Sequence, residues 1–223
     1  MNNERRPLVI FGGGTFASLA AHCVTHDGQR TVAAFTVDAA YARSETYEGL
    51  PLVAFETLIH QCPPETHDIL VAVGYSRMNG LRHERCDQTI AMGYRLASWV
   101  SSRACVWPDL PVGRNVIIFE QAILQSYVRL GDDVIVRSGA NIGHHSRVGS
   151  HTFVATGVVT GGNVTIGEHC FIGLGAVLRD GITIADRSFI GAGAVVVADT
   201  EADGVYVGSP ARRLPNKRSL DIT

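Results

Sequence analysis

The chain has 223 residues, of which 46% are hydrophobic and 18% charged, and its formal net charge is −2 at pH 7. Lys and Arg are dispersed along the chain and form no basic stripe, which argues against nucleic acid as a partner. No apolar run is long enough for a signal peptide or a membrane span, so we expect a cytoplasmic protein without membrane insertion.

The N-terminal part begins with the pattern of a nucleotide-binding α/β fold. An apolar strand over 7–11 runs into Gly12–Gly14 and then into a helical pattern, whose N-terminus can face a phosphate. A second strand over 31–37 ends at Asp38, where a dinucleotide-binding fold places a ribose-binding carboxylate. Ala17 replaces the last glycine of the GxGxxG fingerprint, so the pattern gives only weak support for NAD.

Strands and helices continue to alternate up to residue 100, which predicts a small α/β domain with a mostly parallel sheet. The expected elements are a strand at 50–53, a helix at 55–61, a strand at 68–73, a helix at 76–92 and a strand at 94–100. Ligands of such sheets bind beyond the carboxyl ends of the strands, here Gly12–Thr15, Asp38 and Gly74–Ser76. A structural dimerisation or lid domain with turn glycines is the alternative.

The C-terminal half carries a six-residue repeat, with an aliphatic residue at nearly every sixth position. The anchors are Val112, Ile118, Leu124, Leu130, Val136, Ile142, Val148, Val154, Thr160, Ile166, Ile172, Leu178, Ile184, Ile190 and Val196. Neither a helix nor an ordinary strand has this period. It predicts a parallel β-helix, in which three hexads close one triangular coil around the anchors and around small inward residues such as Cys170.

Residues three hexads apart become neighbours on adjacent coils of such a prism. His144 follows Gly143 in a predicted turn, with Ser126 on one side and Gly162 on the other. A histidine beside a glycine leaves room for a ligand to approach backbone amides, and its neutral ring can accept a proton. A lone surface histidine is more often only solvated, and that alternative stays open.

A second pair of histidines stacks by the same arithmetic. His151 falls next to His169, with Asp133 and Arg187 in the same column. Two histidines need a third ligand to hold zinc, and the basic Arg187 disfavours a cation. We therefore expect no metal.

Three segments together point to a family. The opening Val9–Gly14, the prism segment Ile142–His145 and the tail Gly204–Arg212 strongly resemble the NeuD/PglD-type bacterial sugar acyltransferases. The tail carries the V-G-x-P-A-[KR] ending common among hexapeptide acyltransferases. The resemblance covers almost the whole chain, and its motifs specify acyl transfer but no particular substrate.

The resemblance implies a Rossmann-like sugar-nucleotide-binding domain over 1–103, a left-handed β-helix acyltransferase domain over 104–200 and a C-terminal tail over 201–223. It implies a homotrimer that uses acetyl-CoA or another acyl-CoA, bound in the cleft between neighbouring prisms. The acceptor would be a nucleotide-linked amino sugar or related sugar for surface glycan. The alternatives are a sialic acid-type O-acetyltransferase, a metalloenzyme of the carbonic anhydrase type and a non-catalytic trimeric binding protein.

The family's site residues carry over by position. The catalytic base falls on His144, with His145 beside it, and the thioester-binding amide falls on Gly162. Further CoA contacts fall on Leu174 and Ala192. The sugar-nucleotide contacts fall on Gly12, Gly14, Asp38, Gly74 and Tyr75. Two departures stand out: His145 replaces a frequent Glu or Asp, and Gly14-Thr15-Phe16 replaces a frequent Gly-His-Gly.

Overall fold

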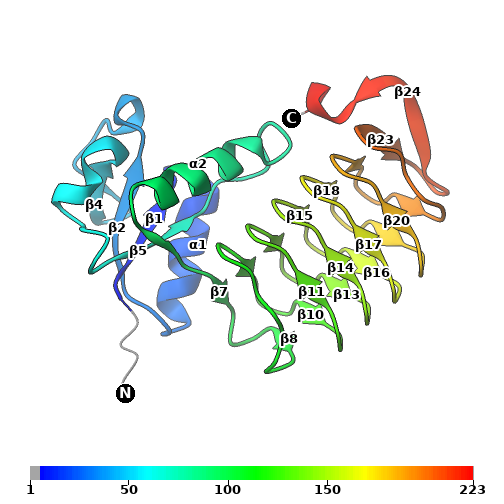
Figure 1. Ribbon diagram of the computed structural model, residues 1–223, viewed down its shortest axis with the longest axis horizontal. Coiled ribbons are helices and arrows are strands. Elements are labelled where there is room, and N and C mark those ends of the chain that lie inside the picture. Colours follow the sequence, from blue (N-terminus) through cyan, green and yellow to red (C-terminus); the bar gives the residue numbers. More distant parts are fainter. Residues whose placement is uncertain (1–5, 223) are drawn as a thin grey trace. The chain divides into compact units, whose positions relative to one another are not determined.

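The computed structural model describes residues 6–222 and divides the chain into two compact units. One unit takes in the chain up to Gly74 together with Glu84–Ala97, and the other takes in Tyr75–His83 and the chain from Ser98 onward (Figure 1). Within residues 6–222, no helix is both long and apolar enough to cross a membrane.

The first unit is built on a mainly parallel sheet. Its parallel strands, in spatial order, are β4 (Leu50–Ala54), β2 (Val32–Val37), β1 (Leu8–Phe11), β5 (Asp68–Val71) and β6 (Arg95–Leu96). The short β3 (Thr46–Tyr47) pairs antiparallel with the outer edge of β4. β1 is central and fully apolar, and its side chains join the buried core of this unit. The predicted α/β alternation is therefore present, with β1 at the middle of the sheet.

Two α-helices and two 3-10 helices complete this region: α1 (Thr15–His26), η1 (Ala39–Tyr41), η2 (Phe55–His60) and α2 (Gly80–Ala91). The predicted helix over 76–92 begins later, because Arg77, Met78 and Asn79 all have positive φ angles near 50–66° that no α-helix accepts. The segment predicted as a helix over 55–61 is the 3-10 helix η2.

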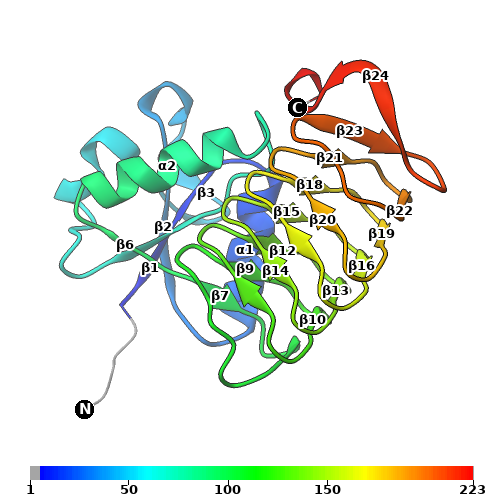
Figure 2. The same cartoon turned by 45° about the vertical axis from the view of Figure 1, so that its right-hand side comes forward.

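The second unit is a prism built mainly of two-residue parallel strands, which form three sheets (Figures 1 and 2). The first sheet contains β8 (Cys105–Val106), β10 (Ile123–Leu124), β13 (Asn141–Ile142), β16 (Val159–Thr160), β19 (Val177–Leu178) and β22 (Val195–Val196). The second contains β11 (Arg129–Leu130), β14 (Arg147–Val148), β17 (Thr165–Ile166) and β20 (Thr183–Ile184). The third contains β7 (Trp99–Val100), β9 (Ile117–Ile118), β12 (Ile135–Val136), β15 (Phe153–Val154), β18 (Phe171–Ile172), β21 (Phe189–Ile190), β23 (Gly204–Val207) and β24 (Arg212–Arg218), followed by η3 (Ser219–Asp221).

The register of these strands is the one that the six-residue period predicts. Ile123 pairs with Asn141, and Asn141 pairs with Val159, so each coil advances by three hexads. The anchors from Ile118 to Val196 are all buried. The prediction for the first anchor, Val112, is wrong. Its side chain is 37% exposed, because Val112 lies in the irregular loop between β8 and β9 and not on a strand. Strands of the same phase precede it, since β7 pairs with β9 and β8 pairs with β10, so Val112 marks an interruption of the repeat and not its start.

The boundaries of the units differ from the predicted ones. The predicted strand over 94–100 is split: β6 closes the first sheet and β7 pairs with β9 of the prism. The second unit thus starts at Ser98 and not at residue 104, and it also takes in Tyr75–His83. The tail predicted as a separate segment from 201 continues the third sheet, because β23 pairs with β21 and β24 folds back on β23.

Candidate active site

His144 and His145 lie exposed at the corner between β13 and β14. The preceding coil holds this corner through two hydrogen bonds. The amide of His144 donates to Gln125 Oε1 at 3.1 Å, and the amide of His145 donates to the carbonyl of Ser126 at 3.0 Å. The backbone that carries both rings is therefore fixed, although the rings themselves are open to solvent.

Thr160 explains why one anchor of the repeat is not aliphatic. Its side chain is buried, and its hydroxyl accepts a hydrogen bond from the amide of Gly143 at 2.8 Å and donates to the carbonyl of Gly161 at 2.9 Å. A buried amide without a partner is costly, so the hydroxyl stabilises the turn directly before His144. The sequence shows the exception in the repeat but gives no sign of this role.

Gly162 lies against the ring of His144, as the stacking arithmetic predicts. A Cβ atom at position 162 would lie 2.4 Å from Cε1 and 2.6 Å from Nε2 of that ring. Only glycine leaves this space. Among residues 6–222, the amide N–H of Gly162 donates to no acceptor, so it is available to a ligand beside the histidine.

The rings of His144 and His145 form a hydrogen-bonded pair. Nδ1 of His144 lies 3.1 Å from Nδ1 of His145, and the ring of Tyr127 packs on His145 at a centroid distance of 4.6 Å. One of the two nitrogens must donate and the other accept. When His144 donates, its Nε2 keeps a lone pair on the side of Gly162. The corner can therefore combine a proton acceptor with a neighbouring hydrogen-bond donor.

The predicted CoA contacts occupy a different corner of the prism. Leu174, which is 58% exposed, and Ala192 sit on adjacent coils between the third and the first sheets. The amide of Gly193 donates to the carbonyl of Leu174 at 2.8 Å, which fixes their stacking. The first sheet, which runs from β8 to β22, separates this corner from the one that carries His144.

Comparison with known proteins agrees with this architecture. Residues 163–198 match the family described as the hexapeptide repeat of succinyl-transferase. No curated protein matches the chain in sequence.

Solved structures match nearly the whole chain. PerB from Caulobacter crescentus, solved with CoA and GDP-perosamine, is 26% identical, with 93% of this chain and 97% of that one covered at a TM-score of 0.84. The acetyltransferase domain of PglB from Neisseria gonorrhoeae, solved with acetyl coenzyme A, is 28% identical, with 94% and 100% covered at a TM-score of 0.84. The chain is therefore similar to sugar acetyltransferases of the NeuD/PglD type. WeeI from Acinetobacter baumannii shares the fold, with 19% identity, a TM-score of 0.70, and 93% of this chain and 99% of that one covered.

In the first unit of this acyltransferase, the predicted nucleotide contacts lie at the ends of β1 and β2. Gly12 has a φ of +138°, and a Cβ there would lie 2.8 Å from the carbonyl oxygen of Ala72, so the turn requires glycine. Gly14 caps the start of α1 without a side-chain hydrogen bond. Asp38 forms an ion pair with Arg85 at 2.8 Å. Sequence reasoning did not anticipate Arg85, because the two residues meet only in the folded sheet.

The last two predicted contacts fall in different units. Gly74 follows β5 in the first unit, and Tyr75 opens the short segment that belongs with the prism. The ring of Tyr75 packs on Phe171 at a centroid distance of 4.3 Å and on Phe153 at 5.5 Å.

A buried ionic network holds this short segment to the prism of the acyltransferase. Arg82 is fully buried and donates from Nε to Oδ1 of Asp133 at 2.8 Å, while Asn115 donates to the same oxygen at 2.7 Å. Burial alone would raise the pKa of Asp133, but the Arg82 guanidinium and the hydrogen bonds from His151 and Asn115 hold that pKa below its usual range. The carboxylate is therefore charged and oriented.

Sequence reasoning also missed His83 in this region. Its ring stacks on His151 at a centroid distance of 3.6 Å and lies 5.1 Å from that of His169. Burial is the main cause of the lowered pKa of His169, and the neighbouring His151 lowers this pKa further. No local pattern marks His83, because it reaches the prism only through the turn over 77–79.

Cys170 points into the prism, as predicted. Its thiol donates to the carbonyl of Ala185 at 3.2 Å, and burial raises its pKa to about 12. A thiol of this kind is not a nucleophile at neutral pH.

Proposed function

We propose that this acyltransferase transfers an acyl group, acetyl by default, from acyl-CoA to the amino group of a nucleotide-linked sugar. The observation that carries the proposal is the contact between the His144 ring and Gly162, which places a proton acceptor beside an amide donor that has no other acceptor among residues 6–222. PerB, which is similar over nearly the whole chain, is solved with CoA and GDP-perosamine, and this supports the two substrate classes.

In the proposed reaction, Nε2 of His144 takes a proton from the attacking amine while the amine nitrogen bonds to the thioester carbonyl carbon. The Gly162 amide donates to the oxyanion that forms, an interaction worth about 2.7 to 4 kcal/mol. The intermediate then collapses, the carbon–sulfur bond breaks, and the proton held by His144 passes to the departing CoA thiolate. A positioned base of this kind contributes roughly 10² to 10⁴-fold to the rate.

His145 would take the orienting role that a carboxylate fills in many relatives. Its Nδ1, at 3.1 Å, can accept the Nδ1 proton of His144 and so leave Nε2 as the base. A neutral imidazole stabilises the developing imidazolium less than a carboxylate does. Direct transfer is expected, because the Cys170 thiol is buried with a pKa raised to about 12, and the exposed Cys105 lies two coils before the strand that leads to His144.

The proposed assembly is a homotrimer with acyl-CoA between neighbouring prisms. An exposed apolar ladder on the first sheet supports it: Ile123, Val159 and Val177 are 39%, 43% and 41% exposed and lie in one register column with Asn141. This ladder lies between the His144 corner and the Leu174 corner. A neighbouring prism on this face would bury the ladder and place the two corners at its borders.

The proposed acceptor site lies in the first unit, which we interpret as Rossmann-like. The strand order β4-β2-β1-β5-β6 has its switch point beside β1, where such sheets bind ligands. The N-terminus of α1 at Gly14, which has no side-chain cap, suits a phosphate, and Asp38, oriented by Arg85, suits a sugar hydroxyl. Gly12 and Gly74 remain proposed contacts of this unit, whereas Tyr75 belongs to the second unit.

A thiol-release assay tests this function. Purified protein is given acetyl-CoA with a panel of UDP-, GDP- and dTDP-linked 4-amino sugars and with free sialic acid. We expect thiol release with one nucleotide-linked sugar, a loss of at least 10² in kcat/KM for His144→Ala, and no change for the exposed control His60→Ala. Release with sialic acid alone would transfer the assignment to an O-acetyltransferase. Full turnover by His144→Ala would overturn the role of the base.

A further inference from the structure

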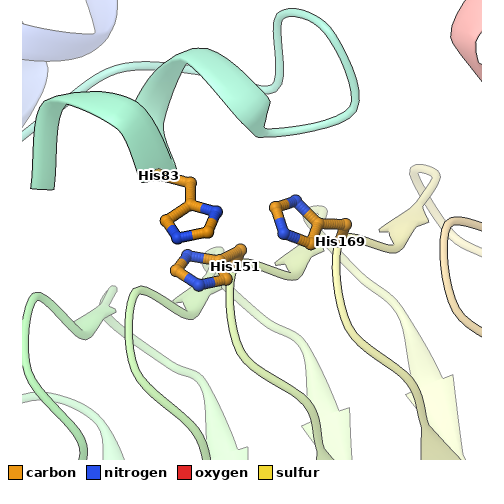
Figure 3. Close-up of side chains that lie close together, drawn as sticks. All are labelled: His83, His151 and His169. Atoms are coloured by element: carbon orange, nitrogen blue, oxygen red, sulfur yellow. The ribbon is translucent and has the colours of Figure 1, made fainter. Parts of the chain in front are cut away.

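Three histidines from distant parts of the chain meet at one corner of the prism (Figure 3). His83 comes from the first turn of α2, and His151 and His169 occupy the same position on adjacent coils, between the second and third sheets. Each ring offers one nitrogen, and these atoms lie within 4.8 Å of one another. All three side chains are half-buried. The corner is not the one that carries His144.

Two of the rings are already oriented as metal-binding histidines are. Nδ1 of His151 lies 3.0 Å from Oδ2 of Asp133, and Nδ1 of His169 lies 3.3 Å from the carbonyl of Met78. A carboxylate and a carbonyl only accept hydrogen bonds, so both Nδ1 atoms carry the proton and both Nε2 atoms keep their lone pairs. Histidine ligands are held in this way, by a carboxylate or a backbone carbonyl on the second nitrogen.

The charges around the cluster are compatible with a cation. Arg187 argues against a metal when only the sequence is considered, but its guanidinium is held by Asp203 at 2.7 Å. The guanidinium of Arg82 is likewise paired with the carboxylate of Asp133. Glu168, which precedes His169 in the chain, adds a negative charge that favours a cation.

We propose that His83, His151 and His169 bind one divalent transition-metal ion, with Zn²⁺ as the best fit to three imidazoles. Zn–N bonds of about 2.0 to 2.1 Å place tetrahedral ligand nitrogens about 3.4 Å apart. The three rings therefore turn toward one another on binding, and His83 leaves its stack on His151. The fourth position is open to water. The ion fastens residues 75–83 to two coils of the prism.

Metal titration of the full chain tests the site. Chelator-treated protein is titrated with Zn²⁺ in competition with a coloured chelator, and with Co²⁺ while its visible d–d absorption is followed. We expect one ion per chain and a higher midpoint of thermal unfolding with Zn²⁺. His83→Gln and His169→Gln each lower the affinity at least tenfold, while the exposed control His60→Gln leaves it unchanged.

A second control separates this cluster from the other histidine pair. Zn²⁺ binding that persists in His144→Ala supports the proposal, and binding that disappears there assigns the ion to the His144 corner and overturns it. Far-UV circular dichroism of each variant shows whether the prism is folded. A folded His83→Gln protein that binds Zn²⁺ as tightly as the unaltered chain also overturns the proposal, as does an unaltered chain that binds no Zn²⁺.

Discussion

Replacing Gly162 by alanine isolates the contact on which the proposed chemistry rests. The added Cβ would lie 2.4 Å from Cε1 of His144, whereas van der Waals contact between carbon atoms requires about 3.5 Å or more. The ring must therefore move by about 1 Å. Its exposed position lets it rotate away, so the free energy of unfolding changes by less than about 1 kcal/mol, well below the cost of overpacking a core.

Catalysis tolerates such a movement poorly, because a misplacement of about 1 Å lowers the rate by about 10²-fold. We expect Gly162→Ala to keep its midpoint of thermal unfolding within a few degrees and to lose about 10²-fold in kcat/KM in the thiol-release assay. Gly80→Ala is the matched control, since its added Cβ meets no atom closer than 3.8 Å. If Gly162→Ala retained a third or more of the activity, the ring would not need its observed place, and the reasoning would fail.

Three further results are expected. His145→Ala lowers kcat/KM by about tenfold or more, because the ring of His144 loses its hydrogen-bond partner. His145→Asn retains most of the activity, because asparagine keeps an acceptor oxygen and tolerates the φ of 59° at this position. Equal losses in the two variants would contradict the orienting role of His145. Thr160→Val leaves a buried amide unpaired and lowers the free energy of unfolding by about 1 to 3 kcal/mol in urea titrations, whereas Thr160→Ser costs less; the reverse order would exclude the hydroxyl as the cause. Burial, and to a lesser extent nearby negative groups, raises the pKa of Tyr94 to about 12. The neutral phenol therefore contributes to the free energy of unfolding in full below a pH of about 10, the pKa of tyrosine in the unfolded chain. This stabilisation is lost as the pH rises from about 10 towards 12. Absorbance titration of the phenol checks the raised pKa. If the Tyr94→Phe variant lost as much stability over this pH range as the unaltered chain, the loss would belong to another group.

The prism was predictable because its packing rule is local and repeated. Each hexad must place one aliphatic side chain in the interior, so the anchors from Ile118 onward appear directly in the sequence. The same arithmetic placed Gly162 beside His144. It failed at Val112, because spacing alone cannot distinguish a strand from a loop that keeps the same phase.

The contacts of residues 75–83 were not predictable in this way. The helical pattern extends back to residue 76, but three successive positive φ angles redirect the chain, and only tertiary packing fixes them. His83 and Arg82 therefore reach His151 and Asp133 without any sequence spacing that links them. The hydrogen bond from Gly143 to Thr160 is similar: the repeat marks Thr160 as an exception, and only the folded coil shows its partner.

The coil-to-coil register has a consequence for how this chain tolerates changes in length. The amide of Asn163 donates to the carbonyl of His144 at 2.8 Å, and the amide of Gly181 donates to the carbonyl of Gly162 at 2.9 Å, so each coil serves as the template for the next. An insertion of one residue would turn every later anchor outward. Adding or deleting an entire coil near the C-terminal end would preserve the coil-to-coil hydrogen bonds of the earlier coils, including those of the corner that carries His144. The whole coil is therefore the unit in which such a protein can grow or shrink during evolution or engineering.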